Sequence, residues 1–143
     1  MIDEAIIQIR EYRGEGYQPL IYFAGWRVAV LNYLDEIHPT RLADMERHLE
    51  TDEAFILLRG KCVLIVGGNG GQAASLTPCE MVNEKVYNVR AGVWHTVLLS
   101  PDASVLIVEN SDTGEGNSEK YNLDDDLRIQ IIEFARQFSF AVD

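Results

Sequence analysis

Cysteine is scarce in this chain. The 143 residues include only two cysteines, Cys62 and Cys79. They form neither a C-x-x-C pair nor a zinc-type spacing, which excludes a disulfide scaffold and a zinc-finger type of domain. Both stand in apolar stretches of sequence, and we expect both to be buried free thiols of a reduced compartment.

Basic residues are also few. Twelve lysines and arginines face 23 aspartates and glutamates, which gives a formal net charge of −11. Nucleic-acid binding depends mainly on neutralising phosphate charges with basic side chains. This composition therefore argues against DNA, RNA and anionic membrane surfaces as partners.

Long hydrophobic runs are missing as well. No apolar stretch approaches the roughly 18 residues that a membrane helix requires. The first residues mix Asp3, Glu4 and Arg10 with isoleucines and lack the apolar segment of a signal peptide. We expect a cytoplasmic protein without membrane contact. The apolar fraction of 47% and the length are those of one globular domain over residues 1–143.

Short strand-like segments follow one another between about residues 20 and 110. The stretch from Leu20 to Asn32 is rich in aromatic and β-branched residues and predicts one or two strands, with Gly25 as a turn. Further strands are predicted at 44–48, 54–58, 61–66, 79–82, 86–89, 96–99 and 104–109. No helix-length pattern lies between them, so the sequence predicts an all-β sandwich or barrel rather than a parallel α/β sheet.

Amphipathic segments flank this β region. Ile2, Ile6 and Ile9 recur at helical spacing and predict a helix over residues 3–12. A second helix is predicted over residues 123–139, with Asn122 as its N-cap and an apolar stripe that packs against the outside of the barrel.

Two glycine-containing or polar stretches are predicted to be loops. The run at 67–71 lacks the G-x-x-x-x-G-K-[ST] pattern of a phosphate loop and is expected to be a hairpin tip. The segment 111–120 is rich in Gly, Ser, Asp and Asn and is predicted to be a loop.

Two of the three histidines lie where they can serve a site. Side chains alternate along a strand, so Glu46 and His48 project to the same face. Glu53 begins the next predicted strand after a turn, and His95 begins a later one. If these faces point into the barrel, the polar groups converge at one end of an apolar cavity. The expected substrate-contacting residues of that cavity are Phe55, Leu57 and Val97.

The spacing of these residues resembles the first motif of the cupin superfamily. That motif reads G-x5-H-x-H-x3-4-E-x6-G, and this chain has Glu46-x-His48-x4-Glu53-x6-Gly60. Thr40 stands at the opening glycine, and Glu46 stands at the first histidine. The resemblance implies a double-stranded β-helix, or jelly-roll, barrel.

The second cupin motif, G-x5-P-x-G-x2-H-x3-N, is matched in part. Gly92-x2-His95 fits it, whereas Glu84, Arg90 and Leu99 replace its Gly, Pro and Asn. The segment from Gly92 to His95 also resembles the Gly-x-Trp-His segment of the ureidoglycolate lyase family. Trp94 should face away from His95, toward the outer side of its strand.

The family resemblance implies a divalent metal, Zn, Fe, Mn or Ni, held by four side chains: Glu46, His48, Glu53 and His95. Two alternatives remain open. If Glu46 faces inward, the site has two imidazoles and two carboxylates. If it faces outward, pairing with Arg41 or Arg47, the histidines and Glu53 can satisfy one another without an ion.

The resemblance implies two kinds of function. The first is a metal-dependent lyase, isomerase or epimerase that acts on a sugar or on a hydroxy or ureide acid. The second is a metal-free, non-catalytic module that binds a small ligand in the same cavity. A homodimer through the aromatic segment from Tyr22 to Trp26 is expected with either.

Overall fold

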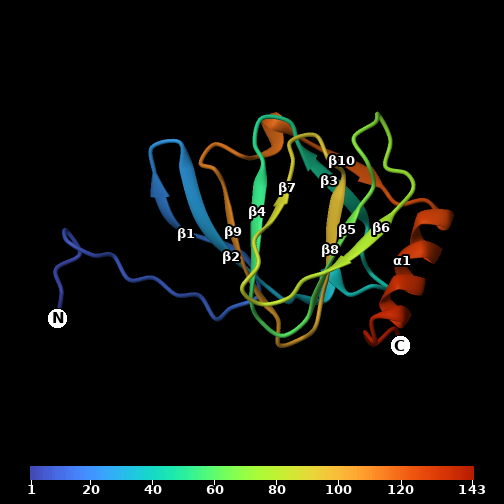
Figure 1. The fold of residues 1–143 in the computed structure, drawn as a ribbon, viewed down its shortest axis with the longest axis horizontal. Coiled ribbons are helices and arrows are strands. Elements are labelled where there is room, and N and C mark those ends of the chain that lie inside the picture. The colour runs from blue at the N-terminus through green and yellow to red at the C-terminus, as the bar shows by residue number, and fades with distance from the viewer.

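The computed structural model describes residues 1–143, and two five-stranded antiparallel sheets face each other in it (Figure 1). One sheet has the strand order β1-β2-β9-β4-β7 and the other β10-β3-β8-β5-β6. This is the predicted mainly β, jelly-roll architecture. The strands are β1 Gly16–Phe23, β2 Trp26–Asn32, β3 Asp44–His48, β4 Glu53–Arg59, β5 Cys62–Val66, β6 Thr77–Glu80, β7 Tyr87–Val89, β8 His95–Leu99, β9 Ser104–Asn110 and β10 Ser118–Asn122.

Helical structure is limited to one α-helix, α1 Asp125–Gln137, and two short 3-10 turns, η1 Asp35–Ile37 and η2 Glu115–Asn117. The predicted C-terminal helix is confirmed, although its N-cap is Asp124, which accepts a hydrogen bond of 2.8 Å from the backbone of Leu127, rather than Asn122. The chain has no helix with the length and apolarity needed to span a bilayer.

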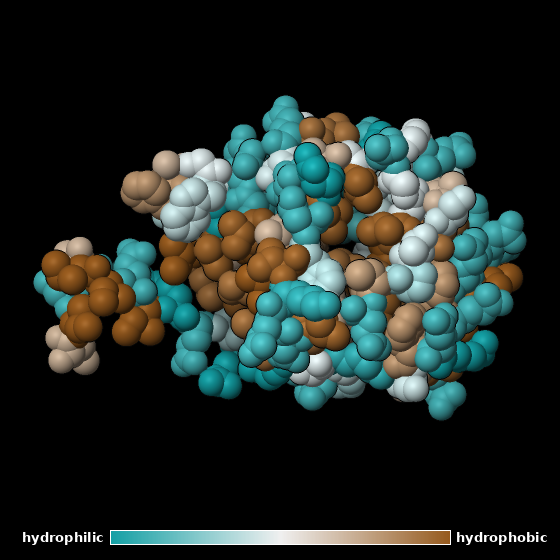
Figure 2. Space-filling model, viewed as in Figure 1, coloured by the Kyte–Doolittle hydropathy of each residue, from teal (hydrophilic) through white to brown (hydrophobic).

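The predicted N-terminal helix is wrong. Residues 3–12 contain a single turn and otherwise run as an extended segment outside the body of the protein (Figure 1). Ile6 and Ile9 are each 76% exposed, and apolar side chains of this segment stand apart from the barrel in Figure 2. An isolated helix of this length is marginal in water, and no apolar surface of the barrel covers its stripe.

The predicted loop at 111–120 is wrong at its end, where β10 begins. This strand pairs with β3, with Ser118 opposite His48 and Asn122 opposite Asp44. Its sequence, SEKYN, lacks apolar alternation because it is an edge strand with three exposed residues. The predicted loop at 67–71 does connect β5 to β6.

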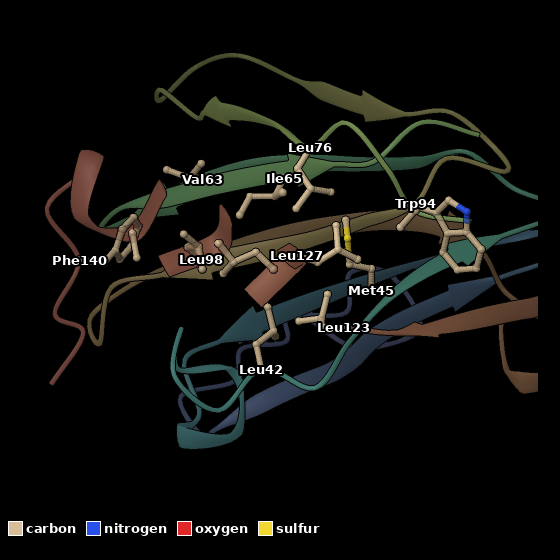
Figure 3. Close-up of a cluster of buried hydrophobic side chains, with 13 residues drawn as sticks. Leu42, Met45, Val63, Ile65, Leu76, Trp94, Leu98, Leu123, Leu127 and Phe140 are labelled. Carbon is tan, nitrogen blue, oxygen red and sulfur yellow. The ribbon is translucent and has the colours of Figure 1, made fainter. Parts of the chain in front are cut away.

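Apolar side chains form two cores on opposite faces of the β10-β3-β8-β5-β6 sheet. Helix α1 covers the outer face, where Leu127 packs with Met45 and Leu98 (Figure 3). The second core fills the space between the sheets and includes Phe55, Leu57, Val97, Leu99 and Val105. The sheet therefore separates a helix-covered outer core from the barrel interior, where the candidate site lies.

The two cysteines differ in environment. Cys62 is fully buried in the inner core, and burial raises the pKa of its thiol to about 12. Cys79 is exposed on the edge strand β6, so the expectation of two buried thiols is wrong for Cys79.

The aromatic residues of the sequence also take two different places. Trp94 is buried in the outer core, on the side of the sheet away from His95, as predicted. Tyr22, Phe23 and Trp26 are exposed where β1 and β2 meet, and the homodimer through them stays a prediction.

Candidate metal centre

Strands β4 and β9 of one sheet and β8 of the facing sheet each place a polar side chain at one end of the barrel interior and apolar side chains beyond it. Because side chains alternate along a strand, every second residue points inward. The inward series are Glu53, Phe55 and Leu57 on β4, His95, Val97 and Leu99 on β8, and Glu109, Ile107 and Val105 on β9. A cavity of about 670 Å³ opens at the polar end.

Glu53 stands between the two histidines. Its Oε1 lies 2.9 Å from Nε2 of His95, and its Oε2 lies 3.3 Å from Nε2 of His48. The imidazole rings meet at an angle of 61° with centroids 5.4 Å apart. All three side chains are at least nine-tenths buried, so the polar atoms of residues from β3, β4 and β8 meet in one shielded place.

The other nitrogen of each imidazole is fixed by the surrounding protein. Nδ1 of His48 lies 2.7 Å from Oγ of Ser118, and Nδ1 of His95 lies 2.9 Å from the carbonyl oxygen of Val93. A carbonyl can only accept, so Nδ1 of His95 carries a proton. The Nε2 of a neutral His95 would then turn its lone pair toward Glu53. The contact therefore requires a proton between Nε2 of His95 and Oε1 of Glu53, or a cation beside them.

Nε2 of His48 is buried and has no hydrogen-bond partner. Although it lies near Glu53, the two groups are not aligned for a hydrogen bond. Buried polar atoms in proteins nearly always have a partner, so this imidazole nitrogen beside a carboxylate is placed to bind a ligand or a water molecule.

Glu46 lies at the mouth of the cavity, with its side chain 45% exposed. Its Oε1 is 3.7 Å from Nε2 of His48, and its backbone pairs with that of His95 across β3 and β8. Arg47 instead pairs with Glu119 and stacks over Trp94. Of the two alternatives left open by the sequence, the structure has the inward-facing Glu46.

Glu109 is a site residue that the sequence analysis missed. Its side chain is only 2% exposed, and its Oε2 accepts hydrogen bonds from the hydroxyl of Tyr17 at 2.8 Å and from Nε of Arg27 at 2.9 Å. Arg27 is held in turn by the carbonyl oxygen of Thr113 at 2.9 Å. The alternation of Val105 and Ile107 predicts an inward position for Glu109. An acidic residue at an inward position was the sequence feature that could have identified Glu109 as a site residue.

Burial and close charges shift the pKa values of these groups. Burial raises the pKa of Glu109 to about 7, with a further increase from the nearby Glu53 carboxylate and an opposing effect of Arg27 and Tyr17. Burial alone would raise the pKa of Glu53, but the adjacent imidazoles of His48 and His95 hold it below its ordinary value. Burial would lower the pKa of either histidine, yet the adjacent Glu53 carboxylate raises both.

The predicted substrate-contacting residues divide into two groups. Phe55 and Val97 line the cavity beside the polar cluster. Leu57 is buried two positions further along β4, in the apolar core, and does not line the cavity. Tyr17, Arg27, Ile107 and Lys120 line it without having been predicted, because their strands carry no motif.

The polar cluster fits a divalent metal. A metal about 2.0–2.2 Å from each nitrogen and oxygen ligand places neighbouring ligand atoms about 3.0–3.5 Å apart. The separations of 2.9 and 3.3 Å around Glu53 are close to this range. Two overlapping sets of ligand atoms lie within 4.8 Å of one another: Glu46, His48 and His95, and His48, Glu53 and Glu109.

Similar solved structures include a cupin and two enzymes. A cupin-2 domain protein from Shewanella frigidimarina has a TM-score of 0.50 at 13% identity, over 69% of this chain and 84% of that one. WlaRA, a TDP-fucose-3,4-ketoisomerase from Campylobacter jejuni, has a TM-score of 0.50 at 18% identity, over 65% of each chain. Pac13, a nucleoside dehydratase known from Streptomyces, has a TM-score of 0.51 at 7% identity, over 78% of this chain and 83% of that one.

These likenesses show that the chain has the cupin fold, as the spacing of its histidines and glutamates predicts. No family model matches the sequence, and no curated protein matches it either. The similarity to ureidoglycolate lyase around Gly92 to His95 stays a prediction.

Proposed function

We propose that this protein binds a divalent metal through His48, Glu53 and His95 and acts on a small polar metabolite. The observation that carries the proposal is the pair of imidazole Nε2 atoms turned toward one buried carboxylate, with Nε2 of His48 lacking any partner. Anchored Nδ1 atoms fix the ring orientations, as partners of metal-binding histidines commonly do. The metal is Zn, Fe, Mn or Ni, since imidazole and carboxylate together suit these ions.

The reaction that suits this site is a lyase, isomerase or epimerase step on a sugar or on a hydroxy or ureide acid. Such a metal supplies Lewis acidity that polarises a substrate oxygen. Glu46, half-exposed at the cavity mouth, is the group placed to accept a substrate proton. Phe55, Val97 and Ile107 form an apolar wall beside it that excludes water from the reacting end. The names of two structural neighbours, a sugar-nucleotide ketoisomerase and a nucleoside dehydratase, support this range of chemistry.

Metal content tests the binding part of the proposal. Protein purified without chelator is expected to contain close to one metal ion per chain by elemental analysis. His48→Gln should lose most of it, whereas the matched control His38→Gln should retain it, because His38 lies in a loop and its side chain bonds only to Thr40. Folding of each variant is followed by circular dichroism. Metal-free wild-type protein with an intact fold, which does not take up added Zn²⁺ or Mn²⁺, refutes the proposal.

A metal-free binding protein is the second candidate, and the hydrogen bond between His95 and Glu53 favours it, because one extra proton on His95 satisfies that pair. A thermal-shift series with sugars, sugar nucleotides and hydroxy acids separates the two functions. An enzyme with a metal centre should show ligand stabilisation that disappears after chelation, whereas a metal-free binder should show the same stabilisation with and without chelator.

A further inference from the structure

We infer that Glu109, rather than Glu46, completes the metal site. This inference rests on the proposed metal binding and concerns which carboxylate joins Glu53. Glu109 lies on β9, outside both cupin motifs, and forms one of the two candidate ligand sets with His48 and Glu53. All three members of that set are buried, whereas the alternative set includes the half-exposed Glu46.

The hydrogen bonds of Glu109 prepare one of its oxygens for a ligand. Tyr17 and Arg27 both donate to Oε2, and none of these hydrogen bonds uses Oε1. The carboxylate is thus held in one orientation by its far oxygen. Partners of this kind orient metal-binding carboxylates and are a common part of metal sites.

Charge balance also favours a cation in the deep position. Two buried carboxylates, Glu53 and Glu109, lie in this part of the site, and only Glu109 pairs with the guanidinium of Arg27. An uncompensated charge in a protein interior is strongly unfavourable. A divalent ion beside His48 removes this cost and also gives the orphaned Nε2 atom a partner.

The carboxylate of Glu46 does not require a cation to compensate its charge. Its side chain is in contact with water at the cavity mouth, and Lys120 stands opposite it across the β3–β10 pair. Removing Glu46 from the ligand set leaves its carboxylate free for the substrate. The structure thus separates a deep carboxylate that holds the metal from an outer one that meets the incoming molecule.

Isosteric variants of the two carboxylates test this assignment. We expect Glu109→Gln to weaken Zn²⁺ or Mn²⁺ binding by at least about tenfold, as loss of a ligand or of its close partner does. Glu46→Gln should change the affinity by less than about threefold. Isothermal titration of chelator-treated protein measures both, and elemental analysis gives the stoichiometry. Glu109→Asp, which keeps the charge beside Arg27 but withdraws the oxygen, serves if Glu109→Gln does not fold, and it should also weaken binding.

The outcomes distinguish this inference from the proposal on which it rests. Wild-type protein that binds no metal refutes the proposed function. Wild-type protein that binds metal, together with a Glu46→Gln variant that loses it and folded Glu109 variants that keep it, overturns the role of Glu109 and leaves the metal site in place.

Discussion

The two ends of the barrel interior are built by the same strands but differ in polarity. At one end, β4, β8 and β9 point Glu53, His95 and Glu109 inward. Four residues away on each strand, the same faces carry Leu57, Leu99 and Val105, all nearly inaccessible to solvent. Each buried aliphatic side chain contributes about 1.5–3 kcal/mol to folding. Each buried carboxylate needs hydrogen bonds or a counter-charge to be tolerated at all.

This difference shows how one pattern of alternation provides both stability and a site. The apolar end does not depend on ions or protons. The polar end depends on a chain of partners, in which Arg27 and Tyr17 hold Glu109 while two histidines hold Glu53. Variants at the polar end should therefore respond to metal and to compensating changes, and variants at the apolar end should not.

The largest effect is expected for Arg27→Met, measured by denaturant unfolding in the presence of chelator. The substitution leaves Glu109 buried without its counter-charge, and breaking such a pair costs about 3–5 kcal/mol of unfolding free energy. Replacing both partners, in Arg27→Met with Glu109→Met, should recover at least half of the loss. A double variant as unstable as the single one contradicts the account of the polar end.

The apolar end is tested on β8 with Leu99→Ala. Leu99 is 2% exposed, and truncation of a buried leucine lowers the unfolding free energy by about 2–5 kcal/mol. The matched control is Leu58→Ala on β4, where 48% of the residue is exposed and a much smaller loss is expected. Because Leu99 lies away from the ligands, the folded variant should keep wild-type metal affinity. A loss of affinity with an intact fold breaks the division of the interior into two ends.

Most of the fold could be predicted from the sequence because its strands alternate or are continuously apolar. Strand β3 has the predicted bounds, and the strands from β4 to β9 differ from prediction by a few residues at most. Strand β10 was missed because edge-strand side chains face water and leave no apolar pattern. The helix predicted over residues 3–12 shows the converse, since an amphipathic stripe predicts a helix only where some surface covers it.

Part of the site could be predicted, because some of its residues lie close together in the sequence. Glu46, His48, Glu53 and His95 lie within two short motifs, and the structure brings them together. Tyr17 and Arg27 lie on the hairpin strands β1 and β2, whereas Glu109 lies on β9, far along the chain, and reaches them only through the pairing of β2 with β9. No local sequence pattern predicts such a cluster, because its members come into contact only when the strands pair in the sheet.

The smallest predicted effect concerns the exclusion of solvent from the apolar end of the barrel interior. The pKa of Cys62 is raised from 9.0 to about 12 in the folded protein, so the folded chain keeps the thiol proton at pH values where the unfolded chain loses it. Stability from this group is complete below pH 9 and falls as the pH rises toward 12. At pH 10 the loss is about 1 kcal/mol relative to pH 8, because one pKa unit corresponds to roughly that free energy.

Denaturant unfolding at pH 8, 9 and 10 measures this loss, with Cys79→Ala as the background so that only one thiol remains. The added substitution Cys62→Ala should remove this part of the pH dependence, and the difference in stability between the two proteins should shrink as the pH rises. Iodoacetamide should alkylate Cys79 of the folded wild-type protein and leave Cys62 unmodified. Rapid labelling of Cys62 without unfolding would mean that solvent reaches the apolar end, and the contrast between the two ends of the barrel would then be lost.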